Sequence, residues 1–137
     1  IGGIVLLVTI ELLDFRDGLR RFQRWSEEQA HTAGLTPAQH QLLLAIRGHG
    51  DAPSIREVAD HLLLRHHSVV ELVDRAAHRG LVQRFADEAD QRITRLQLTP
   101  EGARRVELLA AAHLEELSRL RPWFGSLWSD LPPSISA

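Results

Sequence analysis

The sequence contains no cysteine, methionine, tyrosine or lysine. Without cysteine, the chain has no disulfide bonds, thiolate metal sites, cysteine nucleophiles or thiol redox sensors. All 16 basic residues are arginines, and together with 18 acidic residues they give a formal net charge of −2. Overall charge therefore does not indicate a nucleic-acid partner, and any such partner must be recognised through a local arrangement of side chains.

Long apolar runs are also missing. The apolar segment within residues 1–13 falls well short of the roughly 20 residues that cross a bilayer, and it lacks the basic start and cleavage site of a secretory leader. We therefore expect a cytoplasmic protein with no membrane partner. The 137 residues, 44% of them hydrophobic, fit a single globular domain.

Patterns typical of enzymes are absent as well. The sequence has no glycine-rich phosphate loop and no recognisable nucleophile motif. The acidic pairs at 27–28, 87–88 and 115–116 are adjacent residues, so their side chains point in different directions. We interpret them as solvated surface charges. We predict that the chain is not an enzyme and needs no cofactor.

What is present is a series of helices with clear starts and ends. Apolar residues three and four apart predict a helix over about residues 4–33, which Gly34 ends. Capping boxes at 36–39 and 54–57 begin two further helices. A fourth helix is expected over about residues 66–79.

After the fourth helix, the apolar period changes from 3.6 to 2. Residues 81–86 and 93–98 therefore predict an antiparallel hairpin around a polar turn. Thr99 and Pro100 begin a long last helix, which Pro122 is expected to break or kink. The tail beyond it is ambiguous between a short helix through Trp128 and a frayed end. The predicted fold class is mainly α with a small β-hairpin.

This order of elements is that of a winged helix-turn-helix flanked by two terminal helices. Short motifs lie in sequence along the same region: GLTPAQ at 34–39, IREVADHL at 55–62, LVDR at 72–75, RGLV at 79–82, DQR at 90–92 and LTPEG at 98–102. As a collinear set they resemble the MarR (multiple antibiotic resistance regulator) family. The resemblance covers about residues 35–105 at consistent spacing.

The resemblance implies a bacterial transcription regulator, for example a repressor, that binds palindromic operator DNA as a homodimer and is released by a small anionic or phenolic effector. Residues 1–33 would form an N-terminal dimerisation helix, 34–99 the DNA-binding domain, and 100–137 a C-terminal dimerisation helix and tail. Helix 66–79 would enter the major groove, which is wide enough for a helix. The wing, 81–98, would reach the flanking minor groove or backbone.

Helical geometry predicts which face of helix 66–79 stays free. At 100° per residue, its apolar residues gather on one side and pack inward: Val69, Leu72, Val73 and Ala76. The other side carries His67, Val70, Glu71, Asp74, Arg75 and His78, with His66 and Ser68 in the first turn. A free helix start with polar side chains suits phosphate and base-edge contacts.

The resemblance also implies individual DNA-contacting residues. Within helix 66–79, the family positions near DNA correspond to His66, His67, Ser68, Val70 and Arg75. Arg92 of the wing would enter the minor groove or contact phosphate, with Asp90 bracing the wing. Because the charge between residues 65 and 95 nearly cancels, binding must come from the placement of a few arginines: Arg75, Arg84, Arg92 and Arg95.

Two residues depart from the family pattern. Arg65 stands where the family usually has a Ser or Thr cap, and Glu71 faces the groove where a neutral or basic residue is common. Glu71 can accept a hydrogen bond from a cytosine amino group, but it can equally repel phosphate. The alternative function is therefore a winged-helix protein-interaction module, or a degenerate family member without DNA binding.

The terminal helices carry apolar seams at heptad-like spacing. The seams comprise Val8, Leu12, Phe15, Leu19 and Phe22 in the first helix, and Val106, Ala110, His113, Leu117 and Leu120 in the last. They either cover the domain's own core or pair with a second copy. We favour pairing between copies, because helices projecting from a small domain have little of it to pack on.

A candidate effector pocket and a possible metal site complete the predictions. Arg16 or Arg20 would be the counter-ion of an anionic effector, and Trp25 would line the pocket with Trp123, Phe124 and Trp128, although aromatic residues at a seam also serve as plain packing. Some family members sense zinc through His and carboxylate ligands. No His-x3-His pair occurs among His61, His66 and His67, and His31, His40 and His113 could converge only through tertiary structure. We predict no metal site.

Overall fold

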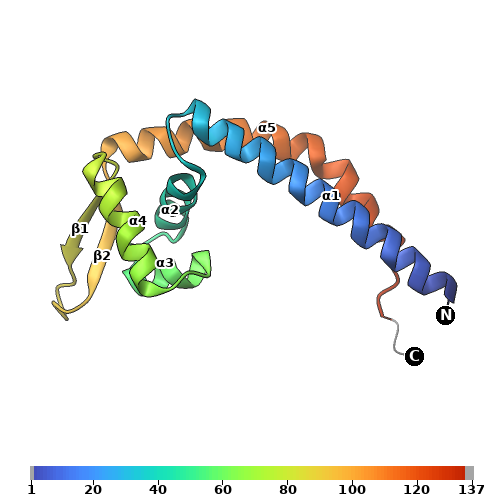
Figure 1. Ribbon diagram of the computed structural model, residues 1–137, viewed down its shortest axis with the longest axis horizontal. Helices are drawn as coiled ribbons and strands as arrows, with labels where there is room; N and C mark the ends of the chain where they lie inside the picture. The colour runs from blue at the N-terminus through green and yellow to red at the C-terminus, as the bar shows by residue number, and fades with distance from the viewer. Residues whose placement is uncertain (1, 135–137) are drawn as a thin grey trace.

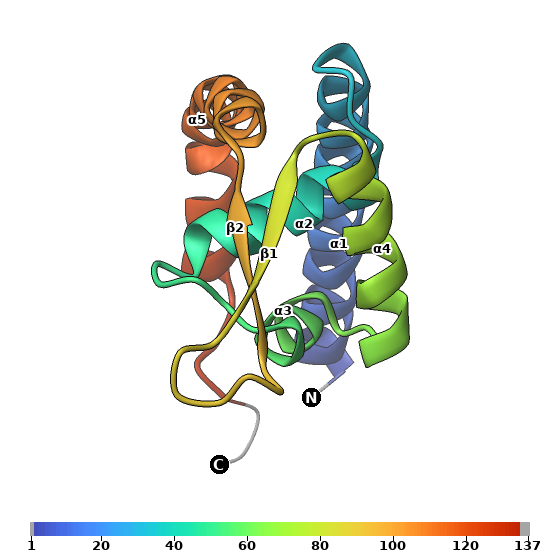
Figure 2. The same cartoon turned by 90° about the vertical axis from the view of Figure 1, so that its left-hand side faces the viewer.

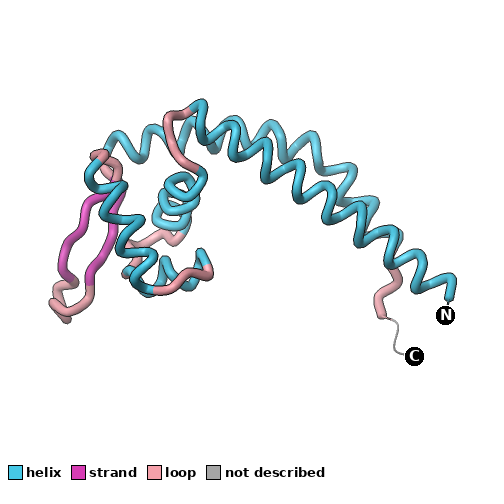
Figure 3. Tube along the Cα trace, in the orientation of Figure 1, coloured by secondary structure: helices cyan, strands magenta, loops and turns pink. Residues whose placement is uncertain are grey.

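The computed structural model describes residues 2–134, apart from the side chain of Ser126. Its elements are α1 (Gly2–Thr32), α2 (Pro37–Gly48), α3 (Ile55–Leu62), α4 (His66–His78), β1 (Val82–Ala86), β2 (Thr94–Leu98) and α5 (Pro100–Asp130). Figure 3 shows helices joined by short loops, with one hairpin. The predicted fold class is confirmed, and the element boundaries lie within about two residues of those expected for the first four helices and the hairpin.

Two regions stand apart in the molecule. The winged domain, residues 30–109, contains α2, α3, α4, the hairpin and the adjoining ends of α1 and α5. The arm consists of residues 2–29 of α1 and 110–130 of α5, which lie side by side and extend away from the winged domain (Figure 1). None of the helices in the described part of the chain combines the length and apolarity that crossing a bilayer requires.

The core lies inside the winged domain and draws on every element. The inward face predicted for the fourth helix is confirmed, because Val69, Leu72, Val73 and Ala76 are all buried. They pack with side chains from the other elements: Leu35, Leu42, Leu43, Ile46, Val58, Leu81, Leu96, Val106 and Leu109. This shared core fixes the position of α4 relative to the rest of the domain.

β2 holds the hairpin to the segment before α3. β1 and β2 pair antiparallel, with Val82 opposite Leu98 and Ala86 opposite Thr94. Leu96 is buried, and its amide donates to the Pro53 carbonyl at 2.8 Å, while Ser54 forms a bridge with Arg95. The segment before α3 therefore adds a short third pairing to the hairpin and limits how far the wing can move.

A close backbone contact joins the start of α5 to the start of β1. The Thr99 amide donates to the Leu81 carbonyl at 3.1 Å, and the Thr99 hydroxyl caps α5 at Gly102. A Cβ atom at position 102 would lie 2.2 Å from the Leu81 carbonyl oxygen. Glycine is therefore required at this position by space rather than by backbone conformation.

Of the break or kink predicted at Pro122, the break is wrong, because α5 continues through this residue to Asp130. Proline removes one backbone donor and crowds the preceding turn, which usually ends a helix. Here the side chains that follow hold the helix in place, since Trp123 packs over Gly18 and Phe124 contacts Phe15 edge to face at 6.2 Å. The last three residues of the expected tail, 135–137, lie outside the described residues.

The apolar seams of the terminal helices pack partly within one chain, while their pairing between copies stays a prediction. Phe15 contacts Phe124 and Trp128 of the same chain, with ring centroids 6.2 and 6.0 Å apart, and Phe22 contacts His113 at 5.9 Å. Both seams therefore lie partly between α1 and α5, which supply each other with the packing surface that the winged domain does not offer. Leu12 and Leu117 stay exposed.

Candidate nucleic-acid interface

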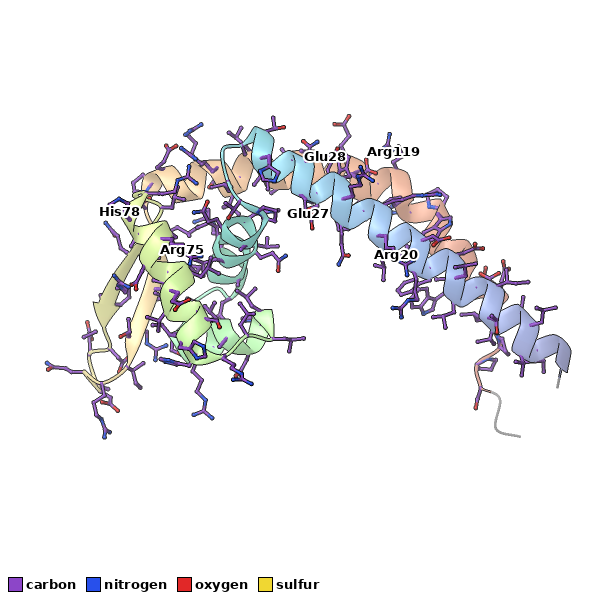
Figure 4. All side chains as sticks on the ribbon, in the orientation of Figure 1. Arg20, Glu27, Glu28, Arg75, His78 and Arg119 are labelled. Atoms are coloured by element: carbon purple, nitrogen blue, oxygen red, sulfur yellow. The ribbon has the colours of Figure 1, made fainter. Side chains whose placement is uncertain are left out.

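The outer face of α4 is open to solvent along its length. His66, His67 and Arg75 are exposed, as are the three remaining polar residues predicted there: Glu71, Asp74 and His78. Ser68 and Val70 are half-buried, and Val70 packs against the edge of the core. Figure 4 labels Arg75 and His78 on α4, and Arg20 and Arg119 partway along the arm, away from α4.

The N-terminus of α4 has no side-chain cap. Arg65 occupies the cap position in an extended conformation, and its side chain makes no capping hydrogen bond. The amides of Ser68 and Val69 donate to the Arg65 carbonyl, at 3.1 and 3.2 Å, which leaves the amides of His66 and His67 at the positive end of the helix dipole. The departure noted at Arg65 thus leaves an open site for a phosphate-like anion.

The turn that leads into α4 is strained and apolar. Leu63 has φ +54°, in the left-handed region that favours glycine, and 91% of its surface is exposed. Its neighbour Leu64 donates from its amide to the Ala59 carbonyl at 3.1 Å and so closes the end of α3. Leu63 therefore projects into solvent next to the start of α4.

At the wing tip, Asp90 holds Arg92. The Asp90 carboxylate accepts hydrogen bonds from the Arg92 amide (3.1 Å), Nε (3.0 Å) and Nη2 (3.1 Å). These bonds hold the pKa of Asp90 below its usual range, because they favour the charged carboxylate. The Arg92 side chain is 90% exposed, so the wing presents a guanidinium that is fixed in place but fully accessible.

Arg95 lies in β2 near the tip of the wing and is enclosed by acceptors. Its Nε donates to Asp87 at 2.8 Å, and its Nη1 donates to Glu57 and to the Ala52 carbonyl, at 3.2 and 3.1 Å. The hydrogen bond from Arg95 lowers the pKa of Asp87, and the Ser54 amide is the main cause of the lowered pKa of Glu57. Arg95, predicted as a DNA contact, is thus placed to position the wing against α3.

Arg84 plays a similar part between strand and helix. It forms an ion pair with Asp74, which joins β1 to the outer face of α4. Figure 2, which views the molecule from the wing end, shows α4 beside the hairpin with α2 behind them. Arg84 in β1 thus joins the hairpin to α4, and Arg95 in β2 joins it to Glu57 of α3.

Sequence reasoning missed a polar chain that extends from Glu57 to the end of α2. His49 Nε2 lies 2.8 Å from Glu57 Oε2, and His49 Nδ1 lies 3.0 Å from His61 Nε2. Glu57 was visible in the sequence only as a capping residue. His49, which contacts Glu57, lies directly after α2. No local pattern in the sequence indicated a contact between these two residues.

The histidines considered as metal ligands divide into separate groups. His40 and His113 are neighbours with ring centroids 5.2 Å apart, whereas His31 is exposed. His113 binds Ser26 Oγ through Nε2 and the Leu109 carbonyl through Nδ1, both at 2.7 Å. Within residues 2–134, no three His, Asp or Glu side chains are grouped so as to hold a metal ion.

The residues predicted for an effector pocket occupy different surroundings. Arg16 and Arg20 are exposed, and Arg20 pairs with Asp17 of the same helix at 3.1 Å. Trp25 packs between Phe22 and His113, with ring centroids 6.2 and 4.8 Å away. Trp25 therefore faces α5, where it also lines a cavity described below.

Comparison with known proteins gives a consistent family. A model described as MarR family matches residues 33–93. The HTH-type transcriptional repressor MdtR of Bacillus subtilis (strain 168) is 28% identical over 92 residues, which are 67% of this chain and 59% of that protein. The chain thus spans about three fifths of the length of the curated relative it matches.

Solved structures show the same architecture. A MarR family protein from Bacillus stearothermophilus superposes with a TM-score of 0.73 at 23% identity, over 84% of this chain and 79% of that one. The S. aureus MepR–DNA complex superposes with a TM-score of 0.68 at 20% identity, over 77% and 76% of the two chains. At these identities the likeness concerns the fold. Over residues 33–93 the chain is similar to the MarR family in sequence, and its fold is that of the MarR family structures.

Proposed function

We propose that this protein is a transcription regulator that binds palindromic operator DNA as a homodimer. In this proposal α4 enters the major groove and the hairpin wing lies on the flanking minor groove or backbone, while a small-molecule effector releases the DNA. The observation that carries the proposal is the pairing of an open, uncapped α4 with an exposed Arg92 held in place by Asp90.

The geometry suits a duplex in two ways. The free amides at the start of α4 can bind a phosphate, while His67 and Arg75 lie on the exposed face that would meet base edges. Arg92 stands on a short hairpin next to that helix, as a side chain must to enter the neighbouring minor groove. Because Arg95 and Arg84 hold the hairpin, the Arg92 guanidinium reaches DNA without reorganising the wing.

A second copy is the proposed occupant of the exposed apolar surface on the arm. Apolar side chains that are between 38% and 67% exposed line both helices of the arm: Ile4, Val5, Leu6, Leu7, Ile10, Leu12 and Leu13 on α1, and Leu114, Leu117 and Trp128 on α5. So large an apolar surface is unusual on a monomer and typical of a subunit interface. Pairing of two arms would fix two α4 helices about one DNA turn apart, roughly 34–36 Å.

The matched relatives agree with this function. MdtR is named as a transcriptional repressor, and the MepR structure is a complex with DNA. By this likeness we assign DNA binding and transcription regulation to the present chain as part of the proposal. An enzymatic activity has no support from these relatives.

The position of Glu71 favours the alternative function, which is a winged-helix protein-interaction module or a family member without DNA binding. Its carboxylate is exposed in the middle of the α4 outer face, where it would approach either a cytosine amino group or a phosphate. The two functions predict opposite outcomes for the same measurement, since only a DNA-binding protein retains fragments of duplex DNA.

The test is a salt-titrated fluorescence anisotropy measurement on duplexes selected by the protein from its source genome. Arg92→Ala should weaken binding by about 1–3 kcal/mol, the usual range for a lost contact in such an interface. Arg24→Ala is the matched control, because it removes the same charge from an exposed position on the arm. If no duplex is selected, or if both variants bind as the wild type does, the proposed function is wrong.

A further inference from the structure

A cavity lies between the two helices of the arm, away from the proposed DNA interface. Its volume is about 320 Å³, which falls in the range of small-molecule sites, roughly 300–1,000 Å³. Residues from the middle of α1 and from the second half of α5 line it: Asp14, Asp17, Gly18, Arg21, Phe22, Glu116, Leu120 and Trp123.

The cavity has an aromatic wall because position 18 is glycine. A Cβ atom at Gly18 would lie only 2.1 Å from Cη2 of Trp123, so the indole packs directly over the α1 backbone. Phe22, one turn further along α1, forms another part of the wall and stacks with Trp25 at 6.2 Å. Aromatic faces carry negative partial charge and attract cations.

The charged residues of the cavity are mostly acidic. Three carboxylates line it, from Asp14, Asp17 and Glu116, against the single guanidinium of Arg21. Glu116 is the most enclosed of the ion-paired carboxylates on the arm, with its side chain 12% exposed. Within residues 2–134, Asp14 is in no ion pair. The cavity therefore offers negative charge beside aromatic faces.

The arginines that now pair with these carboxylates are easily displaced. Arg20 binds Asp17, and Arg119 binds Glu116, with arginine side chains that are 63% and 73% exposed. In both pairs the arginine is screened by water, although the Glu116 carboxylate is enclosed. A ligand cation entering the cavity can therefore replace either arginine, which then extends into water.

A second cavity, of about 400 Å³, continues this surface along α5. Glu116 and Arg119 line it together with Trp25 and Glu115, so Glu116 contributes to both cavities. Together the two cavities offer carboxylates and aromatic side chains to one extended ligand. Glu116 is the carboxylate that lines both of them.

We propose that the cavity between α1 and α5 binds a lipophilic organic cation, such as a quaternary ammonium or phosphonium compound with aromatic groups. This inference rests on the proposed function, in which it names the class of the effector. The resemblance to the family implied an anionic or phenolic effector with Arg16 or Arg20 as counter-ion, but the carboxylates of this cavity repel an anion. A cation bound here would separate α1 from α5 and so alter the arm that spaces the two DNA-binding domains.

The test uses the full chain with tetraphenylphosphonium as the cationic probe and salicylate as the anionic probe. Binding is measured by isothermal titration calorimetry and by quenching of tryptophan fluorescence, because Trp123 lines the cavity. We expect binding of tetraphenylphosphonium and weaker or undetectable binding of salicylate. Glu116→Gln should raise the Kd of the cation about tenfold, as expected for the loss of one charge in a partly enclosed site.

Two variants keep the result interpretable. Asp17→Asn should also weaken cation binding if Glu116→Gln does not fold, while Glu27→Gln removes an exposed α1 carboxylate that lines neither cavity and should bind as the wild type does. The inference is overturned if the wild type does not bind the cation, if all variants bind it equally, or if salicylate binds more tightly.

DNA binding measured on the same preparations separates this inference from the proposed function. Retention of DNA without any cation binding overturns only the cation site. Cation binding that depends on Glu116, in a protein that binds no DNA, supports the site and overturns the regulator function on which its role as an effector site rests.

Discussion

The winged domain and the arm differ in where their apolar and charged side chains find partners. In the winged domain, apolar residues of every element meet in one buried core, and some of the ion pairs join different elements, as Arg84–Asp74 and Arg47–Glu107 do. In the described residues of the arm, each ion pair joins two residues of one helix, and many leucines and isoleucines are exposed. The winged domain thus buries its apolar side chains within one chain, whereas the arm leaves many of its apolar side chains exposed.

The largest expected effect is on the free energy of unfolding, when glycine is replaced by alanine in each of the two regions of α5. Gly102→Ala should destabilise the protein by about 3 kcal/mol, because the new methyl group would meet the Leu81 carbonyl oxygen, which belongs to the backbone. Gly125→Ala on the arm has open space around the new Cβ and should stabilise the protein by up to about 1 kcal/mol through helix propensity. Urea denaturation followed by circular dichroism measures both. Equal effects would mean that the two ends of α5 are not packed differently.

A smaller effect is expected when the exposed surface of the arm is made polar. Leu114→Glu should raise the dissociation constant of the homodimer at least about tenfold, because a charge would enter an apolar interface. Leu63→Glu, at a still more exposed leucine of the winged domain, is the control and should leave assembly unchanged. Sedimentation equilibrium gives the constants. A wild type that stays monomeric at micromolar concentration, or a Leu114→Glu variant that dimerises normally, contradicts the assignment of the arm.

The smallest effect concerns pH at the junction of the two regions. Burial, and secondarily the nearby His113, lower the pKa of His40 below its ordinary value of 6.5. The unfolded chain therefore takes up a proton at a higher pH than the folded protein. The contribution of His40 to the free energy of unfolding is therefore fully present above pH 6.5. It is lost as the pH falls below 6.5 towards the pKa of His40 in the folded protein.

Unfolding free energies measured between pH 7.5 and 5.5 test this linkage. His40→Gln should have a flatter pH profile than the wild type, because glutamine does not titrate. His31→Gln is the control, since His31 is exposed and should leave the profile unchanged. Identical slopes for the wild type and His40→Gln would show that His40 does not couple proton binding to folding.

Local patterns in the sequence were sufficient to predict most of the fold. Both capping boxes form as expected, and Gly34 and Gly80 end helices with positive φ. The inward face of α4 followed from helical periodicity alone. The break at Pro122 was wrong because packing against Gly18 and Phe15 outweighs the local preference of proline, and such packing depends on a helix more than 100 residues away.

Local contacts within the candidate site followed from the sequence, but long-range contacts did not. Asp90 and Arg92 are two residues apart, so their contact is local and the resemblance to the family carried it. Arg95 instead meets Glu57 and Ala52, which are 38 and 43 residues away, and no pattern in the sequence distinguishes a wing-positioning arginine from one that contacts DNA. The same holds for the acidic cavity, whose carboxylates come from both α1 and α5.

Hydrogen–deuterium exchange of the full chain, with and without a duplex selected from the source genome, tests the central claim most directly. We predict that DNA slows exchange at the amides of residues 66–75 and 87–93, while the exposed middle of the arm exchanges as it does in the free protein. Binding that leaves the start of α4 and the wing tip unprotected, or that protects the arm instead, would contradict the account.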